Sequence, residues 1–172
     1  MRRALVVSAA LMLAGCATME DKAPLSGGAT LKDKDGKQIG VATLIQQPDG
    51  VRIAITGYRL PPGVHGLHIH AVGQCQPPEF TTAGAHFNPM GKKHGTQNPE
   101  GAHAGDLPNL DVAANGEGGV DIVSKAVTLG PGPTSLFGDN GTSIVIHTGP
   151  DDMKTDPTGN SGGRIACGVI TR

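Results

Sequence analysis

Hydrophobic and polar residues alternate over short runs along most of the chain, and this period of two predicts β-strands rather than helices. Turn dipeptides of the Asp-Gly and Asn-Gly type separate several of the runs. Eight runs carry the alternation: 29–32, 40–47, 51–58, 65–72, 110–113, 119–127, 143–148 and 164–171. Eight short strands without an amphipathic helical segment predict an all-β sandwich or barrel.

The composition agrees with a β protein that is rich in loops. The chain has 27 glycines, 13 prolines, one tyrosine and no tryptophan, so its core must be built mainly from Val, Ile and Leu. Two connections are unusually long, 73–109 and 149–163. Loops of this length in a compact domain are usually functional, and we expect both to close over the same face of the molecule.

The N-terminus has the features of an export signal. Two arginines precede an apolar run that is too short to span a bilayer and that ends in small residues. The sequence LAGC resembles a bacterial lipoprotein signal, which implies cleavage before Cys16 and a lipid on its sulfur; an ordinary secretory signal with an incidental cysteine is the alternative. We therefore expect a signal peptide over 1–15, a lipidated flexible tether over 16–28 and one domain over 29–172.

Histidines are concentrated in one stretch that holds six of the seven, and the seventh is His147. Because successive side chains of a strand point to opposite faces, His68 and His70 share one face of their strand. His65 has the parity of the core side, so we expect it to be buried and hydrogen-bonded. In its own strand the alternation turns His147 outward, where it can join the pair.

The types of these residues indicate a metal site. Imidazoles held on two rigid strands suit copper or zinc. The remaining histidines lie on the first long loop, which includes His103-Ala-Gly-Asp106, and three imidazoles with one carboxylate make a closed tetrahedral zinc site. Any one histidine could be a solvated or hydrogen-bonded side chain, but that explanation does not account for the whole set.

Six segments together carry a resemblance to a known family. They are HGLHIH, AGAHFNP, KKHG, HAGDLPN, IVIH and GNSGGRIACGVI. In these segments the chain resembles the copper/zinc superoxide dismutases of the bacterial type, and the likeness runs from about residue 29 to the C-terminus. The resemblance sharpens the fold class to an all-β, eight-stranded, flattened Greek-key barrel, an immunoglobulin-like sandwich, with two long functional loops.

This resemblance implies one copper and one zinc per subunit. The copper ligands would be His68, His70, His86 and His147. The zinc ligands would be His86, His94, His103 and Asp106. His86 would bridge both metals, and by the same resemblance it delivers a proton to the departing peroxide while copper cycles between Cu(II) and Cu(I) and superoxide becomes dioxygen and hydrogen peroxide.

The resemblance also implies roles for two residues that do not bind metal. Arg164 would hold the superoxide anion by a charge-assisted hydrogen bond; a structural arginine that pairs with backbone carbonyls is the alternative. Asp151 matches the carboxylate that bridges His68 and His94. Because Asp152 follows it directly, an ordinary acidic loop residue is the alternative for Asp151.

The charge of the chain is nearly balanced, with 14 basic and 15 acidic side chains. Loss of the two arginines of the signal peptide would leave 12 basic and 15 acidic side chains, a formal charge of −3. Nothing in this distribution suggests nucleic-acid binding. An anionic substrate would need a local positive field near the site, and four basic residues are candidates for supplying it. The alternative for the lysines among them is that they are ordinary solvated surface residues. These candidates are Arg164, Lys154, Lys92 and Lys93.

The cysteine content fits an exported protein. If Cys16 carries a lipid, Cys75 and Cys167 remain as an even pair, and we expect a disulfide between them; two buried free thiols are the alternative. Several acyl chains on Cys16 would anchor the protein to a membrane. By resemblance to that lipoprotein class, Ala17 after the cysteine is compatible with the outer membrane, and hence with the periplasm. The bacterial dismutases include both homodimers and monomers.

Two other classes of protein remain open at this point. One is a copper- or zinc-binding envelope lipoprotein on the same scaffold without enzymatic activity, which would be expected to lack a copper ligand or Arg164. The other is a zinc hydrolase that uses His68 and His70, which would need an open zinc position and a nearby general base.

Overall fold

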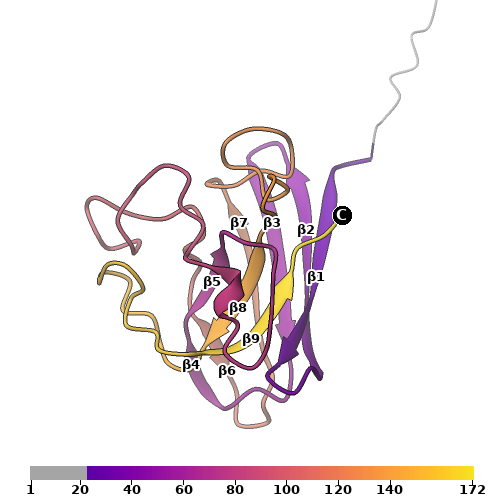
Figure 1. The fold of residues 1–172 in the computed structure, drawn as a ribbon, viewed down its shortest axis with the longest axis vertical. Helices are drawn as coiled ribbons and strands as arrows, with labels where there is room; N and C mark the ends of the chain where they lie inside the picture. Colours follow the sequence, from indigo (N-terminus) through magenta and orange to yellow (C-terminus); the bar gives the residue numbers. More distant parts are fainter. Residues whose placement is uncertain (1–22) are drawn as a thin grey trace, which may run out of the picture.

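The computed structural model describes residues 23–172, which form one antiparallel sheet curved into a nearly closed barrel (Figure 1). The strands are β1 (Ser26–Asp33), β2 (Gln38–Gln47), β3 (Gly50–Gly57), β4 (Gly63–His65), β5 (Leu67–His70), β6 (Leu110–Val112), β7 (Gly118–Ser124), β8 (Ser143–His147) and β9 (Arg164–Val169). Across the sheet they follow the order β4-β6-β7-β3-β2-β1-β9-β8-β5. Helix in these residues is limited to the 3₁₀ turn Thr81–Ala83, and none is long and apolar enough to cross a membrane.

The prediction of an all-β barrel is confirmed, with nine strands in place of eight. The difference arises at Gly66, which divides the expected strand 65–72 into β4 and β5. The Gly66 N–H donates to the carbonyl of Gly149 (2.7 Å), and the Gly66 carbonyl accepts the N–H of His147 (2.9 Å). β4 then pairs with β6, and β5 pairs with β8. The continuous segment from β4 to β5 therefore contains both edge strands of the sheet.

The alternation of apolar residues places the core as expected. Leu67 and Ile69 on β5 and Ile144 and Ile146 on β8 are fully buried in one apolar cluster. Each such side chain contributes about 1.5–3 kcal/mol when it leaves water. His65 is also buried, and its ring nitrogens lie 2.8 Å from the backbone carbonyl oxygens of His147 and Pro61. The outward faces of β5 and β8 therefore remain for the histidines.

A third long connection, 125–142, joins β7 to β8, and the sequence pattern did not single it out. It lies across one end of the barrel (Figure 1) and buries Val127, Leu129 and Leu136 in the core. The Gln46 side-chain oxygen accepts hydrogen bonds from the Leu129 N–H (2.8 Å) and from the neighbouring Thr128 hydroxyl (2.9 Å). This connection contributes to the core and has a structural role.

The N-terminal strand begins earlier than expected. β1 starts at Ser26, three residues before the predicted run 29–32, so its first residues fall within the segment that we expected to be a tether. β1 pairs with β2 along most of its length and with β9 at Lys32 and Asp33. The predicted signal peptide and Cys16 lie outside the described residues.

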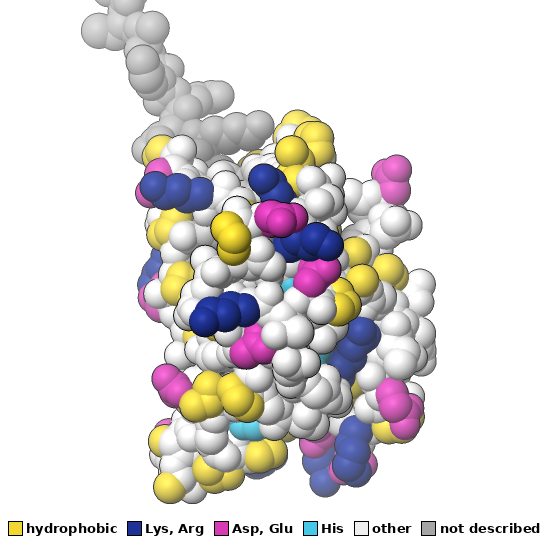
Figure 2. Space-filling model, turned by 90° about the vertical axis from the view of Figure 1, so that its left-hand side faces the viewer, with side chains coloured by type: hydrophobic (Ala, Val, Ile, Leu, Met, Phe, Trp, Pro, Cys, Tyr) yellow, Lys and Arg dark blue, Asp and Glu magenta, His cyan; other side chains and the backbone are white. Residues whose placement is uncertain are grey.

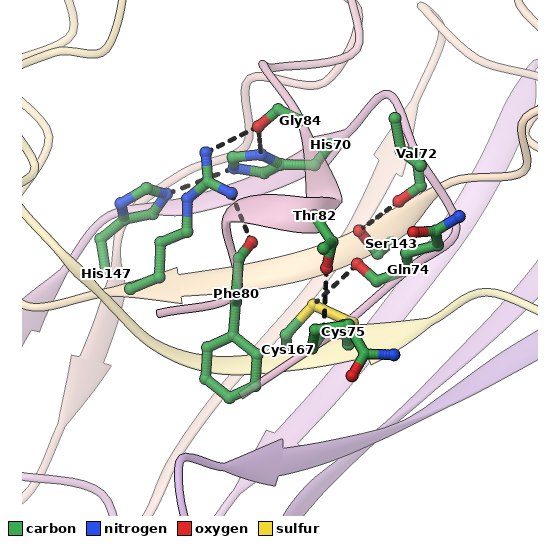
Figure 3. Close-up of a disulfide and its surroundings, with 12 residues drawn as sticks. His70, Val72, Gln74, Cys75, Phe80, Thr82, Gly84, Ser143, His147 and Cys167 are labelled. Atoms are coloured by element: carbon green, nitrogen blue, oxygen red, sulfur yellow. Dashed lines mark hydrogen bonds between the residues drawn. A yellow bond between two sulfur atoms is a disulfide. The ribbon is translucent and has the colours of Figure 1, made fainter. Parts of the chain in front are cut away.

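The predicted disulfide between Cys75 and Cys167 is confirmed, and it joins the start of the loop 73–109 to β9 (Figure 3). The two Cα atoms are 5.6 Å apart, and 92 positions separate the cysteines in the sequence. Around the sulfurs, Phe80 and Val145 form a second, smaller buried cluster with Cys167. The bridge thus fixes the loop against the outer face of β8 and β9.

We predict that Cys75→Ser lowers the free energy of unfolding by about 2–5 kcal/mol, because opening a long covalent loop frees the unfolded chain. Urea titration followed by circular dichroism measures the change. The parent under reducing conditions serves as the control and should lose the same stability. A variant as stable as the oxidised parent would contradict the prediction.

Candidate metal centre

Strand β5 is the last strand of the sheet, and the long loop 73–109 is hydrogen-bonded to its outer edge. The Ile69 N–H donates to the carbonyl of Gly105, and the Phe87 N–H donates to the carbonyl of Ile69, both at 2.8 Å. Two isolated bridges follow: His68 with Asp106, and His70 with His86. Backbone pairing therefore places loop residues directly beside the two histidines of β5.

A β-bulge places Arg164 beside His147. β8 and β9 pair in regular register from Ser143 to Ile146, and the register then shifts so that His147 faces Arg164 rather than Ile165. In an unbroken strand Arg164 would share the face of Ala166, which is buried in the core. The bulge turns the arginine to the outer face, where His147 also points.

His86 lies at the centre of the histidine cluster. Its ring centroid is 3.9 Å from that of His68, 5.0 Å from that of His70 and 6.1 Å from that of His147. One donor atom from each of these four rings lies within 4.8 Å of the others, and the Nε2 atoms of His70 and His147 are 3.4 Å apart. Four convergent imidazoles are a donor set that suits copper.

A second cluster surrounds the carboxylate of Asp106. Its Oδ1 lies 3.1 Å from Nδ1 of His86, 3.1 Å from Nδ1 of His94 and 3.3 Å from Nδ1 of His103. The Nδ1 atoms of His86 and His103 are 3.4 Å apart. Zinc–ligand bonds of about 2.0–2.1 Å in a tetrahedron separate the donor atoms by about 3.3 Å. The four donors therefore fit tetrahedral zinc.

Three buried nitrogens of these rings have no hydrogen-bond partner: His68 Nδ1, His86 Nε2 and His94 Nδ1. Buried polar atoms are nearly always paired, so atoms of this kind fit metal ions as their missing partners. His68 can also be grouped within 4.8 Å of His86, His94 and Asp106. We place His103 in the second set instead, because His103 Nδ1 is at tetrahedral separation from Asp106 and His86.

Asp151 connects the two clusters. One carboxylate oxygen accepts a hydrogen bond from His68 Nε2 (2.7 Å) and the other from His94 Nε2 (3.0 Å), and all three side chains are fully buried. This leaves Nδ1 of each ring directed at a metal site. Asp152, the neighbouring acid, is exposed and accepts hydrogen bonds within its own loop. The bridging position thus belongs to Asp151.

Arg164 is held by the loop that the disulfide anchors. Its two terminal nitrogens donate to the carbonyls of Phe80 and Gly84, both at 2.6 Å. The Gly84 carbonyl also lies 2.9 Å from His70 Nδ1, which makes it a shared acceptor (Figure 3). Arg164 therefore pairs with backbone carbonyls, as the structural alternative held, and it also lines the cavity with His70 and His147.

Burial controls the protonation of the cluster. It lowers the pKa of His68 to about 4, that of His70 to about 2 and that of His147 to about 3. Burial alone would raise the pKa of Asp106 and Asp151, but hydrogen bonds from histidine rings and backbone N–H groups lower both to about 2. At neutral pH these three imidazoles are neutral and the two carboxylates ionised, which are the forms that bind metal.

A surface cavity of about 410 Å³ leads to the cluster. It is lined by His70, His86 and His147 and by the basic residues Lys92, Lys93 and Arg164. Only small patches of histidine surface reach the face of the molecule on which both metal-site loops lie (Figure 2). The cavity therefore admits small ligands to residues that are otherwise buried.

The two predicted functional loops pack against each other, and two residues in this contact were not predicted. Asp156 accepts the N–H of His94 (2.7 Å). The Asn109 side chain accepts the N–H of Asp151 and donates to the Asp151 carbonyl, both at 2.9 Å. Asn109 is the last residue of the segment HAGDLPN, but its partner could be identified only once the loops were placed together.

Comparison with known proteins agrees with this geometry. The family model for copper/zinc superoxide dismutase matches residues 38–170. The chain belongs to the copper/zinc superoxide dismutase family. "Superoxide dismutase [Cu-Zn] 2" of Aquifex aeolicus is 47% identical over 96% of each chain, and the "Superoxide dismutase [Cu-Zn]" of Caulobacter vibrioides is 42% identical over 84% of this chain and 85% of its own.

Two solved structures share this fold. A SOD-like protein from Bacillus subtilis matches with a TM-score of 0.80 and 38% identity over 83% of this chain and 96% of its own. The clock protein EA4 matches with a TM-score of 0.73 and 34% identity over 88% of this chain and 97% of its own. Because the scaffold also occurs in proteins titled SOD-like or clock protein, the donor atoms of this chain carry the functional argument.

We predict that Gly159→Ala weakens metal binding about 10- to 100-fold, the usual effect of losing an outer carboxylate. Gly159 has a φ of +63°, and a Cβ there would lie 2.6 Å from His94 Nε2 and closer still to the Asp151 carboxylate. Metal titration with a chromophoric chelator measures the affinity. Gly36→Ala is the control, because Gly36 also has a positive φ (+77°) but no atom lies within 4 Å of the position of an added Cβ. Equal losses of metal affinity in the two variants would contradict the prediction.

We also predict that the metal-free protein loses stability as the pH falls from about 6.5 to about 3. Unfolded histidines take up protons near their usual pKa of 6.5, whereas His68 and His147 stay neutral in the fold down to about pH 4 and 3. Protons therefore favour the unfolded chain. Urea midpoints at pH 7.5, 5.5 and 4.5 should decrease in that order and less steeply in His147→Gln; a flat profile would contradict the prediction.

Proposed function

We propose that this protein is an envelope superoxide dismutase that uses one copper and one zinc per subunit. Two superoxide anions and two protons would yield one dioxygen and one hydrogen peroxide. The observation that carries the proposal is the position of His86, whose Nδ1 faces the cluster around Asp106 and whose unpartnered Nε2 belongs to the cluster with His68, His70 and His147. One ring thereby belongs to both donor sets.

The ligand sets follow from the two clusters. Copper would be held by His68, His70, His86 and His147. Zinc would be held by His86, His94, His103 and Asp106. When bound, copper supplies the one-electron exchange with superoxide, because imidazole ligands support both of its oxidation states. The zinc set has no open position, which is typical of structural zinc and fits a role in holding the loop 73–109 and the His86 ring in place.

His86 and Arg164 would act on the substrate itself. The Nδ1 of His86 is held at Asp106, so Nε2 is the atom that can take up a proton and release it in the cavity toward peroxide. Burial lowers the pKa of Arg164 from its usual value, but an arginine remains charged at working pH. The guanidinium can then donate its remaining N–H groups to the superoxide anion.

Asp151 would keep the two metal sites aligned. Its carboxylate holds Nε2 of both His68 and His94, so each ring presents Nδ1 in one tautomer and one orientation. Its own backbone is fixed by the side chain of Asn109. The residue thus couples the loop 149–163 to both clusters without touching substrate.

The cell envelope is the proposed location. The signal sequence, with cleavage before Cys16 and lipidation of its sulfur, would export the protein to the periplasm and anchor it, and Ala17 after the cysteine is compatible with the outer membrane. The disulfide between Cys75 and Cys167 supports an oxidising compartment. Metabolic labelling with a fatty acid, compared with a Cys16→Ser variant, tests the anchor.

Two variants separate the metal sites. We predict that His147→Ala reduces dismutation to the level of the metal-free protein while zinc stays bound, because the His147 ring is not among the donors around Asp106.

Asp106→Ala should release zinc and retain copper at reduced activity, because it removes the carboxylate on which the second cluster converges.

Elemental analysis and a superoxide-scavenging assay on metal-reconstituted protein measure both results. An active His147→Ala variant would remove that residue from the copper site. Unchanged zinc content in Asp106→Ala would overturn the zinc assignment. A parent that binds both metals and does not dismutate superoxide would overturn the proposed function.

A further inference from the structure

His94, a ligand of the proposed zinc site, is attached to the loop 149–163 at two points. Nε2 of its ring lies 3.0 Å from Oδ1 of Asp151, and its backbone N–H donates to Oδ1 of Asp156 at 2.7 Å. His94 itself belongs to the other long loop, 73–109, which lies beside the loop 149–163 (Figure 1). Two carboxylates of one loop therefore hold the ring and the main chain of a single residue of the other.

Asp156 lies in a closed turn, so its carboxylate starts from an ordered backbone. The Asp152 side chain accepts the N–H groups of Lys154 (2.9 Å) and Thr155 (2.8 Å). On the other side of Asp156, the N–H of Gly159 donates to the Thr155 carbonyl at 2.7 Å. The His94 N–H therefore meets an acceptor whose own main chain is fixed by hydrogen bonds within its loop.

The main chain at His94 is held from the zinc side as well. Asp106 directs Oδ1 at the histidine rings, and its Oδ2 accepts the backbone N–H groups of Gly95 (2.8 Å) and His103 (3.0 Å). The consecutive N–H groups of His94 and Gly95 are thus each taken by a carboxylate. Asp156 supplies the one of these two contacts that crosses to the loop 149–163.

The hydrogen bond of Asp156, more than its charge, is the property that acts on zinc. Its Oδ2 lies 3.4 Å from the Lys93 ammonium, and its side chain is 38% exposed. Its Oδ1 is 3.9 Å from Nε2 of His103, which is too far for a direct hydrogen bond. A carboxylate that is both paired and screened by water contributes little field at the metal, whereas its contact with the His94 N–H is short and leads directly to a ligand.

We propose that Asp156 is a positioning residue for the zinc site: it fixes the main chain of His94 so that the ring, held at Nε2 by Asp151, presents Nδ1 to zinc. This inference rests on the proposed zinc site. Without Asp156 the ring would keep one attachment while its backbone could shift, and zinc–ligand distances tolerate only about 0.2 Å. Because His94 belongs to the zinc set alone, the loss should fall on zinc and spare copper.

The test compares Asp156→Ala with Asp156→Asn. Alanine removes the acceptor, whereas asparagine keeps an oxygen acceptor for the His94 N–H and removes only the charge. We expect zinc affinity, measured by competition with a chromophoric chelator, to fall about 10- to 100-fold in the alanine variant and less than about 3-fold in the asparagine variant. Copper affinity, measured with zinc in excess, should change less than about 2-fold in both.

Two further measurements follow His94 itself and do not depend on activity. Tetrahedral cobalt(II) bound in place of zinc has visible absorption bands that depend on ligand geometry. These bands should shift in Asp156→Ala and stay in place in Asp156→Asn. In the metal-free protein, hydrogen exchange of the His94 amide should be at least about 10-fold faster in the alanine variant, because the hydrogen bond that protects it is lost.

Two control variants separate this role from effects of net charge and of the ion pair. Asp139→Ala removes an exposed carboxylate of the connection 125–142 and should keep the parental zinc affinity. Lys93→Gln removes the other partner of Asp156 and should not weaken zinc binding, because the contact with His94 remains.

Four results would overturn the inference. Parental zinc affinity in Asp156→Ala would show that the contact is dispensable, and equal losses in the alanine and asparagine variants would show that charge is what matters. A loss in Lys93→Gln as large as that in Asp156→Ala would assign the effect to the ion pair. Equal losses of copper and zinc affinity would show a general disturbance of the loops. In all four cases the parent binds zinc, whereas a parent without zinc would overturn the proposed function instead.

Discussion

The pairing of β5 with the long loop is the constraint on which the rest of the site depends. β5 is a short strand at the edge of the sheet. The backbone N–H and carbonyl on its outer edge are hydrogen-bonded to two residues of the loop 73–109, Gly105 and Phe87. Since these bonds are made by main-chain groups, they fix the positions of His86 and Asp106 opposite His70 and His68. The edge of the strand is thereby protected from solvent and from pairing with another chain. The same hydrogen bonds hold the two loop residues with metal-ligating side chains in defined positions.

Burial of the cluster has both a cost and a function. The six imidazoles of the two donor sets and the carboxylates of Asp106 and Asp151 are removed from water, and in the metal-free protein protonation of the cluster favours the unfolded chain. The same burial keeps the imidazoles of His68, His70 and His147 neutral and leaves three ring nitrogens of the cluster without a hydrogen-bond partner. Metal ions can supply the missing interactions, so metal binding adds directly to the stability of the fold.

The disulfide, the arginine and β5 form a second connected unit. Cys75 joins the loop to β9, and the loop then provides the Phe80 and Gly84 carbonyls that hold Arg164. Because the Gly84 carbonyl also contacts His70, a change at the sulfurs reaches both Arg164 and a proposed copper ligand.

The sequence by itself determined the class of fold, the two functional loops, the outward faces of His68, His70 and His147, and the disulfide. These follow from side-chain alternation, loop length and residue type, which are local properties. Only the tertiary structure decided the break at Gly66, the burial of the connection 125–142, and the bulge that turns Arg164 away from the core. Each of these depends on how distant backbone segments pair, and a period of two carries no information about the partner strand or its register.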